Sequence, residues 1–383
     1  MDFELDKATG AFRAEVRSFM RTHVTEDVLK QAHETGTMHN WDLHRALAAR
    51  GWIALSWPVE YGGLGRDPVE SAVFFEEANY AAAPLYGMNT TMVAARALLR
   101  SASEELKQAI IPKVLAGEII ICLGFSEPDS GSDVAAAKTR AVRDGGQWMV
   151  NGQKVFTSTA EECAYVFLLT RTNVDVAKHQ GLTTFLVPMN SEGIEIAPIH
   201  TLGERTNMTF YRDVRVDDAW RVGEVDRGWD VMTGALSFER GGHGFHGHMI
   251  RVLEQATAAL APRSGAGRSS RAAEELGRFA AEVEVCRLLD HRTAWLAAQG
   301  GLAGVEGSMA KLYSSERYTA FCATALDLLG PEGLLQNGDD GAPAGGALEY
   351  AHRFATPTTV YGGSSEVQRS IIAERGLGLP RSR

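Results

Sequence analysis

TPTTVYGGSSEVQRSIIAERGLG, residues 356–378, is the segment around which the rest of the chain is best interpreted. Its apolar positions Val367 and Ile371 recur at helical spacing, which predicts an amphipathic helix over residues 366–375. The small residues 362–364 before it allow backbone N–H groups to approach a ligand closely. A helix N-terminus with free N–H groups binds anions, most commonly phosphate. The segment is therefore either a phosphate-binding turn or an ordinary C-terminal helix that follows a glycine turn.

Sequence signals also mark both ends of this helix. Ser365 and Gln368 have the spacing of a capping box, in which a hydroxyl accepts a hydrogen bond from the first helical turn. Arg375 followed by Gly376 is a typical stop signal.

Composition limits the class of protein. The chain has 383 residues, 45% of them hydrophobic, so it can bury a large core, and its net charge is −10. No basic stripe is present, which argues against nucleic acid as a partner. The four cysteines lack C-x-x-C spacing, and the N-terminus lacks a basic region followed by an apolar run. We therefore expect reduced thiols in a cytoplasmic protein that neither carries a signal peptide nor spans a membrane.

The pattern of apolar residues changes twice along the chain and predicts an α+β fold. Residues 1–118 show helical periodicity and read as an N-terminal helical domain. Residues 119–222 consist of short, β-rich runs separated by turn residues, which predicts a β-barrel or sandwich. Helical periodicity returns over residues 223–383, where we expect a helical bundle with long helices over residues 271–299 and 304–329.

One turn within the β-rich region has a particularly clear signal. Asn151-Gly152 lies between two apolar runs, and this dipeptide favours a two-residue hairpin turn. We expect a hairpin to reverse there.

Four motifs, taken together and in this order, resemble the acyl-CoA dehydrogenase family. They are FSEPDSGSD at residues 125–133, GQKVFTS at 152–158, LGER at 202–205 and YGGSSEVQR at 361–369. The resemblance covers nearly the whole chain, and it implies an N-terminal helical domain, a middle β domain and a C-terminal four-helix bundle.

The resemblance also implies a set of residues that bind FAD. Hydroxyl groups beside a glycine turn suit flavin carbonyl and pyrophosphate oxygens. Phe156 is in the position of an aromatic residue that lies against the flavin ring, although on residue type alone it reads as a strand core residue. The predicted cofactor-binding residues are Phe125, Ser126, Gly131, Ser132, Phe156, Ser158, Gly363, Ser364 and Glu366.

The largest departure from the family pattern is Gly362. Many members have the catalytic glutamate there, and a second arrangement in the family places it on the first helix of the C-terminal domain, in an L-x-x-E-R context. Residues 236–240, LSFER, match that context, so we expect Glu239 to be the base with Arg240 beside it. A carboxylate in an apolar cleft has a raised pKa, which suits a general base. The backbone N–H of Gly362 can still bind the thioester carbonyl oxygen.

A run rich in glycine and histidine follows the expected base. Glycines inside a helix each cost roughly 1 kcal/mol relative to alanine, so either the helix breaks or the side chains were removed for a bulky acyl group. His243, His246 and His248 have the residue type of metal ligands. No carboxylate or cysteine framework accompanies them in the sequence, so we expect no metal site.

Two further departures concern the oligomer. In the family's homotetramer a neighbouring subunit supplies an R-x-x-F-G and a Q-x-x-G-G motif to FAD. Here the corresponding segments read RSGAG at residues 263–267 and LLGPEG at 328–333. Bacterial relatives that act on sterol-derived CoA thioesters have similar gaps and pair with a homologous subunit. We expect either a homo-oligomer that holds FAD differently or a heterotetramer with such a partner.

The predicted function is FAD-dependent dehydrogenation of an acyl-CoA to the 2,3-enoyl-CoA, with a bulky, sterol-derived acyl group as one possibility. An electron-transfer flavoprotein is the expected electron acceptor. Two alternatives remain, because fold does not fix chemistry: a flavin-dependent monooxygenase or oxidase, and a non-catalytic subunit that completes a partner's site.

Overall fold

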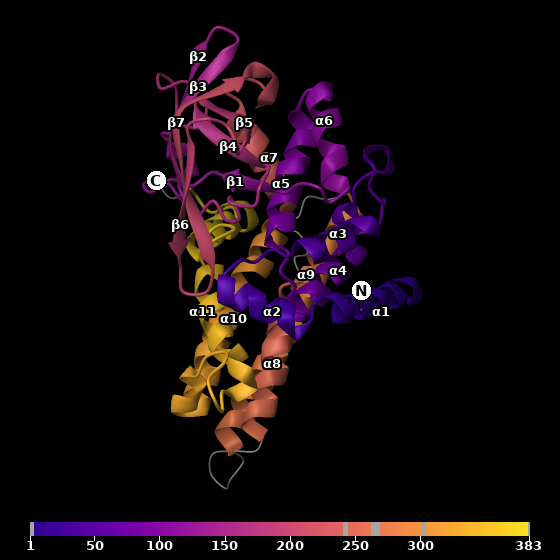
Figure 1. Ribbon diagram of the computed structural model, residues 1–383. Helices are drawn as coiled ribbons and strands as arrows, with labels where there is room; N and C mark the ends of the chain where they lie inside the picture. Colours follow the sequence, from indigo (N-terminus) through magenta and orange to yellow (C-terminus); the bar gives the residue numbers. More distant parts are fainter. Residues whose placement is uncertain (1–3, 240–243, 262–268, 301–303, 382–383) are drawn as a thin grey trace. The chain divides into compact units, whose positions relative to one another are not determined.

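The computed structural model describes residues 4–239, 244–261, 269–300 and 304–381 (Figure 1). Its contacts divide the chain into two compact units. Unit 1 consists of residues 1–25, 67–83 and 240–383, and unit 2 of residues 26–66 and 84–239. Each unit therefore joins segments that are far apart in the sequence.

The sheet of unit 2 is built from eight strands. They are β1 (Ile121–Gly124), β2 (Arg140–Asp144), β3 (Gln147–Val155), β4 (Tyr165–Arg171), β5 (Leu182–Pro188), β6 (Ile194–His200), β7 (Arg205–Asp217) and β8 (Arg221–Val222). Their order is β6-β7-β3-β2-β4-β5-β8, with β1 paired to β4. β2 meets β4 through a single residue pair, Arg140 with Arg171. The strands β6, β7, β3 and β2 are thus joined to β1, β4, β5 and β8 at a single residue pair. Trp148 and Val150 of β3 and Phe185 and Val187 of β5 belong to one core.

Helices accompany this sheet in unit 2. They are α2 (Glu26–Thr35), α3 (Trp41–Ala49), α5 (Tyr86–Ser101), α6 (Glu104–Leu115) and α7 (Gly228–Glu239). α5 and α7 pack against each other, α5 also against β1 and α7 against β5 (Figure 1).

The hairpin expected at Asn151-Gly152 is wrong. β3 passes straight through this dipeptide, and the chain reverses instead at Gly145 and Gly146, between β2 and β3. Gly152 lies at a bulge where the pairing of β3 with β7 shifts by one residue. A Cβ there would lie 2.6 Å from the Thr139 Cα, so the glycine permits a close backbone approach rather than a turn.

Unit 1 is helical. Its helices are α1 (Lys7–His23), α4 (Pro68–Tyr80), α8 (His246–Leu260), α9 (Ser269–Ala298), α10 (Val305–Leu329), α11 (Ala347–Thr358) and α12 (Ser365–Ile371). Buried residues of α8, α9, α10 and α11 form one core, in which the rings of Phe279 and Phe321 stack 3.5 Å apart. The two long helices expected from periodicity are therefore present as α9 and α10.

The chain forms two separate helices, α7 and α8, before and after the run rich in glycine and histidine. α7 ends at Glu239 and α8 begins at His246, with Gly244 at φ +57°. A Cβ on Gly244 would lie 2.1 Å from the Glu76 backbone nitrogen, and one on Gly247 would lie 2.2 Å from the Glu76 carbonyl oxygen. These two glycines therefore allow the start of α8 to touch the backbone of α4.

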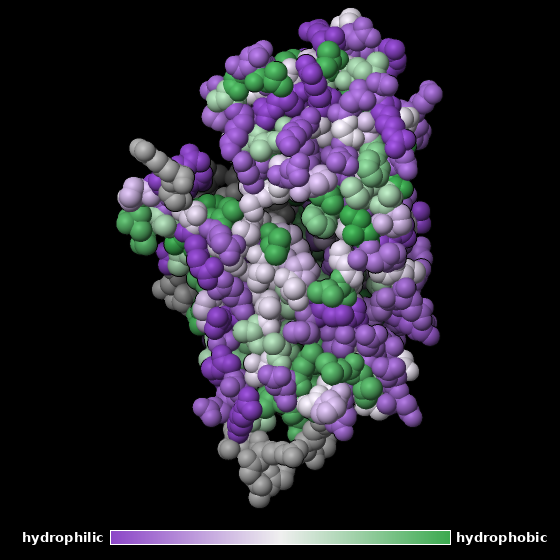
Figure 2. All heavy atoms as spheres, turned by 90° about the vertical axis from the view of Figure 1, so that its left-hand side faces the viewer, coloured by the Kyte–Doolittle hydropathy of each residue, from purple (hydrophilic) through white to green (hydrophobic). Residues whose placement is uncertain are grey.

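Surface and thiol chemistry can also be compared with the sequence. The four cysteines are free and buried, as expected. In the described part of the chain, no helix is both long and apolar enough to cross a membrane. Hydrophilic residues cover most of the face drawn in Figure 2, with hydrophobic residues in small groups between them. That distribution is consistent with the net charge of −10.

Candidate functional site

The loop that follows β1 lies directly beside the end of β3. The Val155 N–H donates to the Ser126 carbonyl oxygen at 2.9 Å, and Lys154 Nζ donates to the Phe125 carbonyl oxygen at 3.1 Å. Phe125 itself is partly buried, and its ring meets that of Phe167 edge to face. The structure thus brings together the sequence motifs at residues 125–133 and 152–158.

A buried ion pair, to which the sequence analysis assigned no role, supports this loop. Lys154 Nζ lies 2.8 Å from Glu127 Oε1, and the same carboxylate accepts the backbone N–H groups of Lys138 and Thr139. Burial raises the pKa of Glu127, but the Lys154 ammonium and these N–H groups outweigh it and hold that pKa below its usual value. Burial lowers the pKa of Lys154 to about 8 against the opposing effect of Glu127. Both groups are therefore charged at neutral pH.

Phe156 is held away from the core, so its interpretation as a strand core residue is wrong. Its side chain is 61% exposed, and its backbone has φ +58°. Its neighbour Thr157 is buried and donates its N–H to the Asn207 carbonyl oxygen at 2.9 Å. Positive φ in a non-glycine residue is strained, and such strain concentrates where ligands bind. An exposed aromatic ring on a strained backbone is a candidate to stack on a flat ligand.

The hydroxyl groups near Phe156 differ in how they are satisfied. Ser158 Oγ lies 2.9 Å from Thr206 Oγ1, so this hydroxyl already has a partner. Ser130 Oγ is buried and has no hydrogen-bond partner among the residues that the structure describes. Gly131 and Ser132 are exposed, and nothing lies within 4 Å of a Cβ added at Gly131. Steric crowding in this chain therefore does not explain the glycine.

In unit 1, side chains hold both carbonyl groups of the Gly362-Gly363 turn. The two glycines have φ +64° and +90°. Gln368 Nε2 donates to the Gly362 oxygen at 2.9 Å, and Lys311 Nζ donates to the Gly363 oxygen at 2.7 Å. Burial lowers the pKa of Lys311 to about 8. Lys311 was not among the predicted site residues, because nothing local in the sequence of α10 indicates that its ammonium reaches this turn.

The helix after this turn starts one residue earlier than the capping box predicts. Ser364 is the N-cap of α12, and its Oγ accepts the Val367 N–H at 3.4 Å. The capping box of Ser365 and Gln368 is therefore wrong. The Gln368 side chain points back to the glycine carbonyls instead of capping the helix.

Glu366 is exposed in the first turn of α12. Its own backbone N–H and the Ser364 hydroxyl lower the pKa of this carboxyl. α12 continues into a π-helical turn at Ile372–Gly376. The N-terminus of α12 therefore carries a fixed negative charge beside its backbone N–H groups.

The expected base lies at a helix end. Glu239 is the last residue of α7 in unit 2, whereas Gly362 belongs to unit 1. Met232 and Leu236 of α7 join a core with Leu169 of β4. The Glu239 side chain and all of Arg240 lie outside the described residues. Their catalytic roles, and the pairing of Glu239 with Gly362, stay predictions.

Comparison with known families identifies the chain. Three models match it in succession: acyl-CoA dehydrogenase N-terminal domain at residues 6–118, middle domain at 122–218 and C-terminal domain at 226–377. The chain belongs to the acyl-CoA dehydrogenase family. The expected fold class is thereby confirmed, as is the assignment to an oxidoreductase of this type. The domain bounds 1–118, 119–222 and 223–383 remain our proposal.

Relatives and solved structures agree with this membership. Acyl-CoA dehydrogenase FadE26 of Mycobacterium tuberculosis is 33% identical over 387 residues, which cover 97% of this chain and 96% of the relative. A structure described as the Tcur3481-Tcur3483 steroid ACAD has a TM-score of 0.92 at 32% identity and covers all of both chains. The ChsE4-ChsE5 complex from Mycobacterium tuberculosis has a TM-score of 0.90 at 32% identity, again over all of both chains.

Proposed function

We propose that this acyl-CoA dehydrogenase uses FAD to oxidise a CoA thioester with a bulky, sterol-derived acyl group to its 2,3-enoyl-CoA. The similarity to a structure described as a steroid ACAD, over the full length of both chains, supports a sterol-derived acyl group. The exposed, strained Phe156 is the observation that carries the cofactor assignment.

The residues present fit a flavin. Phe156 presents a flat ring, the loop that follows β1 carries the hydroxyl groups of Ser126 and Ser132, and the buried Ser130 Oγ lacks a partner in the described chain. In unit 1, Gly363 and Ser364 offer backbone and hydroxyl contacts to the adenosine and pyrophosphate end. Bound FAD would supply the acceptor for the hydride that leaves the substrate β-carbon.

The chain's own residues supply the proton chemistry. As the β-hydride departs, the Glu239 carboxylate takes the α-proton, and the two electrons of the broken Cα–H bond form the new C=C bond. The backbone N–H of Gly362 donates to the thioester oxygen, where negative charge develops. Lys311 and Gln368 hold the carbonyl groups of this turn and so orient it. Arg240 is the cationic neighbour of the base.

A spectroscopic titration tests this function. The protein, purified together with a homologous partner chain where flavin binding requires one, should show a flavin absorption band, which a sterol-derived acyl-CoA bleaches under anaerobic conditions. Short straight-chain acyl-CoA thioesters should bleach it more slowly. Faster reaction with the short chains would contradict the bulky acyl group but leave the dehydrogenase assignment intact.

A matched pair of variants tests the base. Glu239→Gln should still bind flavin. The rate at which the substrate bleaches this flavin should fall at least about 100-fold, because general-base catalysis contributes factors of that order. Glu105→Gln, an exposed glutamate of α6, should react like the unmodified chain. Unchanged bleaching in Glu239→Gln would exclude Glu239 as the base, and isolation of the chain without flavin would favour a non-catalytic subunit. Rapid reaction of the reduced protein with oxygen would favour an oxidase or monooxygenase over transfer to an electron-transfer flavoprotein.

We also propose that a homologous subunit completes the cofactor site. Residues 263–267, RSGAG, have alanine in place of the phenylalanine of R-x-x-F-G, and residues 328–333 lack the glutamine of Q-x-x-G-G; the family's homotetramers use both motifs to contact a neighbour's FAD. Two of the similar structures carry the names of two components. Expression of this chain alone and with a homologous partner chain, followed by mass and flavin measurements, tests the idea. Full flavin occupancy in a homo-oligomer would contradict it.

A further inference from the structure

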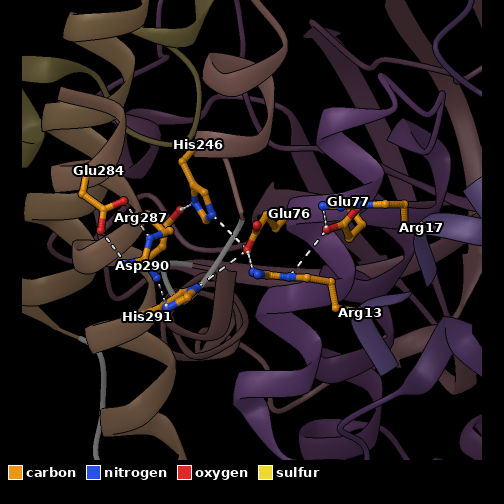
Figure 3. Close-up of polar contacts among 9 residues, drawn as sticks. All are labelled: Arg13, Arg17, Glu76, Glu77, His246, Glu284, Arg287, Asp290 and His291. Carbon is orange, nitrogen blue, oxygen red and sulfur yellow. Dashed lines mark hydrogen bonds and ion pairs between the residues drawn. The ribbon is translucent and has the colours of Figure 1, made fainter. Parts of the chain in front are cut away.

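A cluster of ionisable side chains is buried in unit 1, where α4, α8 and α9 pack together (Figure 3). Glu76 comes from α4, His246 begins α8, and Asp290 and His291 are consecutive residues of α9. His246 is fully buried, and the other three residues are 5–8% exposed. Neither the dehydrogenase chemistry nor the cofactor contacts proposed above use this cluster.

Three atoms of the cluster have the spacing of a metal coordination shell. His246 Nε2 lies 3.1 Å and His291 Nε2 lies 3.7 Å from Glu76 Oε2. All three atoms lie within 4.8 Å of one another. Zinc bonds of about 2.0–2.1 Å to nitrogen and oxygen place neighbouring ligands of a tetrahedral site roughly 3.3 Å apart. The two distances to Glu76 Oε2 lie on either side of that value.

The two ring nitrogens that face Glu76 lie within ion-pair distance of its carboxylate but make no well-directed hydrogen bond to a described residue. Within the described part of the chain, His246 Nε2 and His291 Nε2 are buried without a hydrogen-bond partner. The His246 contact at 3.1 Å is short enough for an ion pair, but its direction does not suit a hydrogen bond. Buried polar atoms of this kind are rare in folded proteins and point to an unseen partner. A cation between the three atoms would satisfy both rings.

The outer contacts are those that metal sites use. His246 Nδ1 lies 2.8 Å from Asp290 Oδ2, an arrangement that orients a metal-binding imidazole through its other ring nitrogen. Arg13 Nη2 donates to Glu76 Oε2 at 2.6 Å, and ligating carboxylates are commonly hydrogen-bonded in this way. The close approach of α8 to α4 at Gly244 and Gly247 places His246 beside Glu76.

Two features oppose a metal ion. Burial lowers the pKa of His246, but the carboxylates of Asp290 and Glu76 outweigh it and raise that pKa to about 9, so a proton competes with a metal ion at this ring. Arg287 Nη1 lies 3.3 Å from His291 Nδ1, and a guanidinium is only a donor. In that arrangement Nδ1 accepts and Nε2 carries the proton, so metal binding requires Arg287 Nη1 to turn away. The other two nitrogens of Arg287 already bond Glu284. Arg287 therefore weakens the site without blocking it.

We propose that Glu76, His246 and His291 bind a divalent transition-metal ion of the zinc class. Two imidazole nitrogens and one carboxylate oxygen suit zinc and its neighbours better than magnesium or calcium. Such an ion would tie α4, α8 and α9 of unit 1 together. We expected no metal at the histidine run because no carboxylate or cysteine framework accompanies it in the sequence. In the structure, Glu76 and His291 come from two other helices.

Metal titration of the wild-type chain tests this site. The tag-free protein is stripped with a chelator and titrated with Co²⁺, then with Zn²⁺. We expect one ion per chain, visible Co²⁺ bands of a four-coordinate site, and displacement of Co²⁺ by Zn²⁺. Absence of stoichiometric binding by the folded wild-type chain overturns the proposal and leaves a cluster of ion pairs. This measurement does not depend on whether any variant folds.

Variants then locate the ion. His291→Gln should weaken binding by more than roughly 100-fold, and Asp290→Asn by about 10–100-fold, the usual effect of an outer partner. Arg287→Gln should tighten binding, because it removes the competing donor. His179→Ala, an exposed histidine of unit 2, should have no effect. Unchanged affinity in His291→Gln and Arg287→Gln, with native circular dichroism, would place the ion elsewhere and overturn the proposal.

Discussion

Two glycine-containing segments of unit 1 look alike in the sequence and serve different purposes. Gly244 and Gly247 bring α8 against the backbone of α4, where a side chain would collide with Glu76. Gly362 and Gly363 have positive φ, and side chains hold their carbonyl groups. The first pair exists for packing, whereas the second shapes an exposed turn. Glycine content alone therefore does not reveal a ligand site.

The largest effect is expected for Gly247→Ala. The added Cβ would lie 2.2 Å from the Glu76 carbonyl oxygen, so the two helices must separate. We expect the free energy of unfolding to fall by about 3 kcal/mol, as for overpacking of a tight contact. Gly277→Ala in α9 is the control, because nothing lies within 4 Å of its Cβ and alanine favours the helix. Unchanged stability with an altered acyl preference would instead support glycines that make room for substrate.

A smaller effect on stability is expected for Gly363→Ala. Its φ of +90° strains any other residue, and the Cβ would lie 2.6 Å from Gln368 Nε2. We expect a loss of about 1–2 kcal/mol of stability and at least tenfold weaker flavin binding. Gly378→Ala is the control. Its φ of +66° imposes a similar backbone strain, nothing lies within 4 Å of the added Cβ, and flavin binding should be unchanged. Equal effects of the two variants on flavin affinity would exclude a cofactor role for the turn.

Lys311→Met tests the support beneath this turn. Loss of the hydrogen bond to the Gly363 oxygen should cost about 1 kcal/mol and weaken flavin binding a few-fold. Lys30→Met is the control, since its exposed contact with Glu34 at 3.8 Å should contribute almost nothing. If flavin affinity is insensitive to Lys311→Met, the turn holds its shape without the lysine.

Lys311 should also make stability depend on pH. Burial lowers its pKa from 10.5 to about 8 in the folded chain. Between these values the unfolded chain binds more protons, so stability relative to Lys311→Met should rise from pH 8 to pH 10.5 and be flat on either side. Unfolding of both proteins across this range measures the difference. A fall with pH would mean that the lysine charge stabilises the fold.

Local sequence patterns predicted the larger elements. The helical periodicity of residues 271–299 and 304–329 corresponds to α9 and α10, and the β-rich region forms the sheet. These predictions succeed because an amphipathic element records its buried face in its own spacing. The order of the four motifs also indicated the family, because each motif is a short segment that can be recognised from its residues alone.

Turn details could not be derived from local patterns. Asn151-Gly152 has the chemistry of a hairpin, yet β7 pairs with both sides of it and keeps the strand continuous. Ser365 has the chemistry of an N-cap, yet the glycine turn before it makes Ser364 the cap. In both places long-range pairing or the preceding backbone outweighed a local preference worth about 1 kcal/mol.

The sequence by itself determined the order of helical and β-rich regions and the family motifs, and it predicts that Glu239 takes the place of a base at residue 362. Only the tertiary structure decided which partner each buried polar group meets: Glu127 with Lys154, Lys311 with Gly363, and Glu76 with His246 and His291. The physical reason is that a burial pattern repeats along one element and is visible in sequence. A contact between charges on distant segments leaves no repeating pattern in the sequence, and it forms only once the helices and strands have packed.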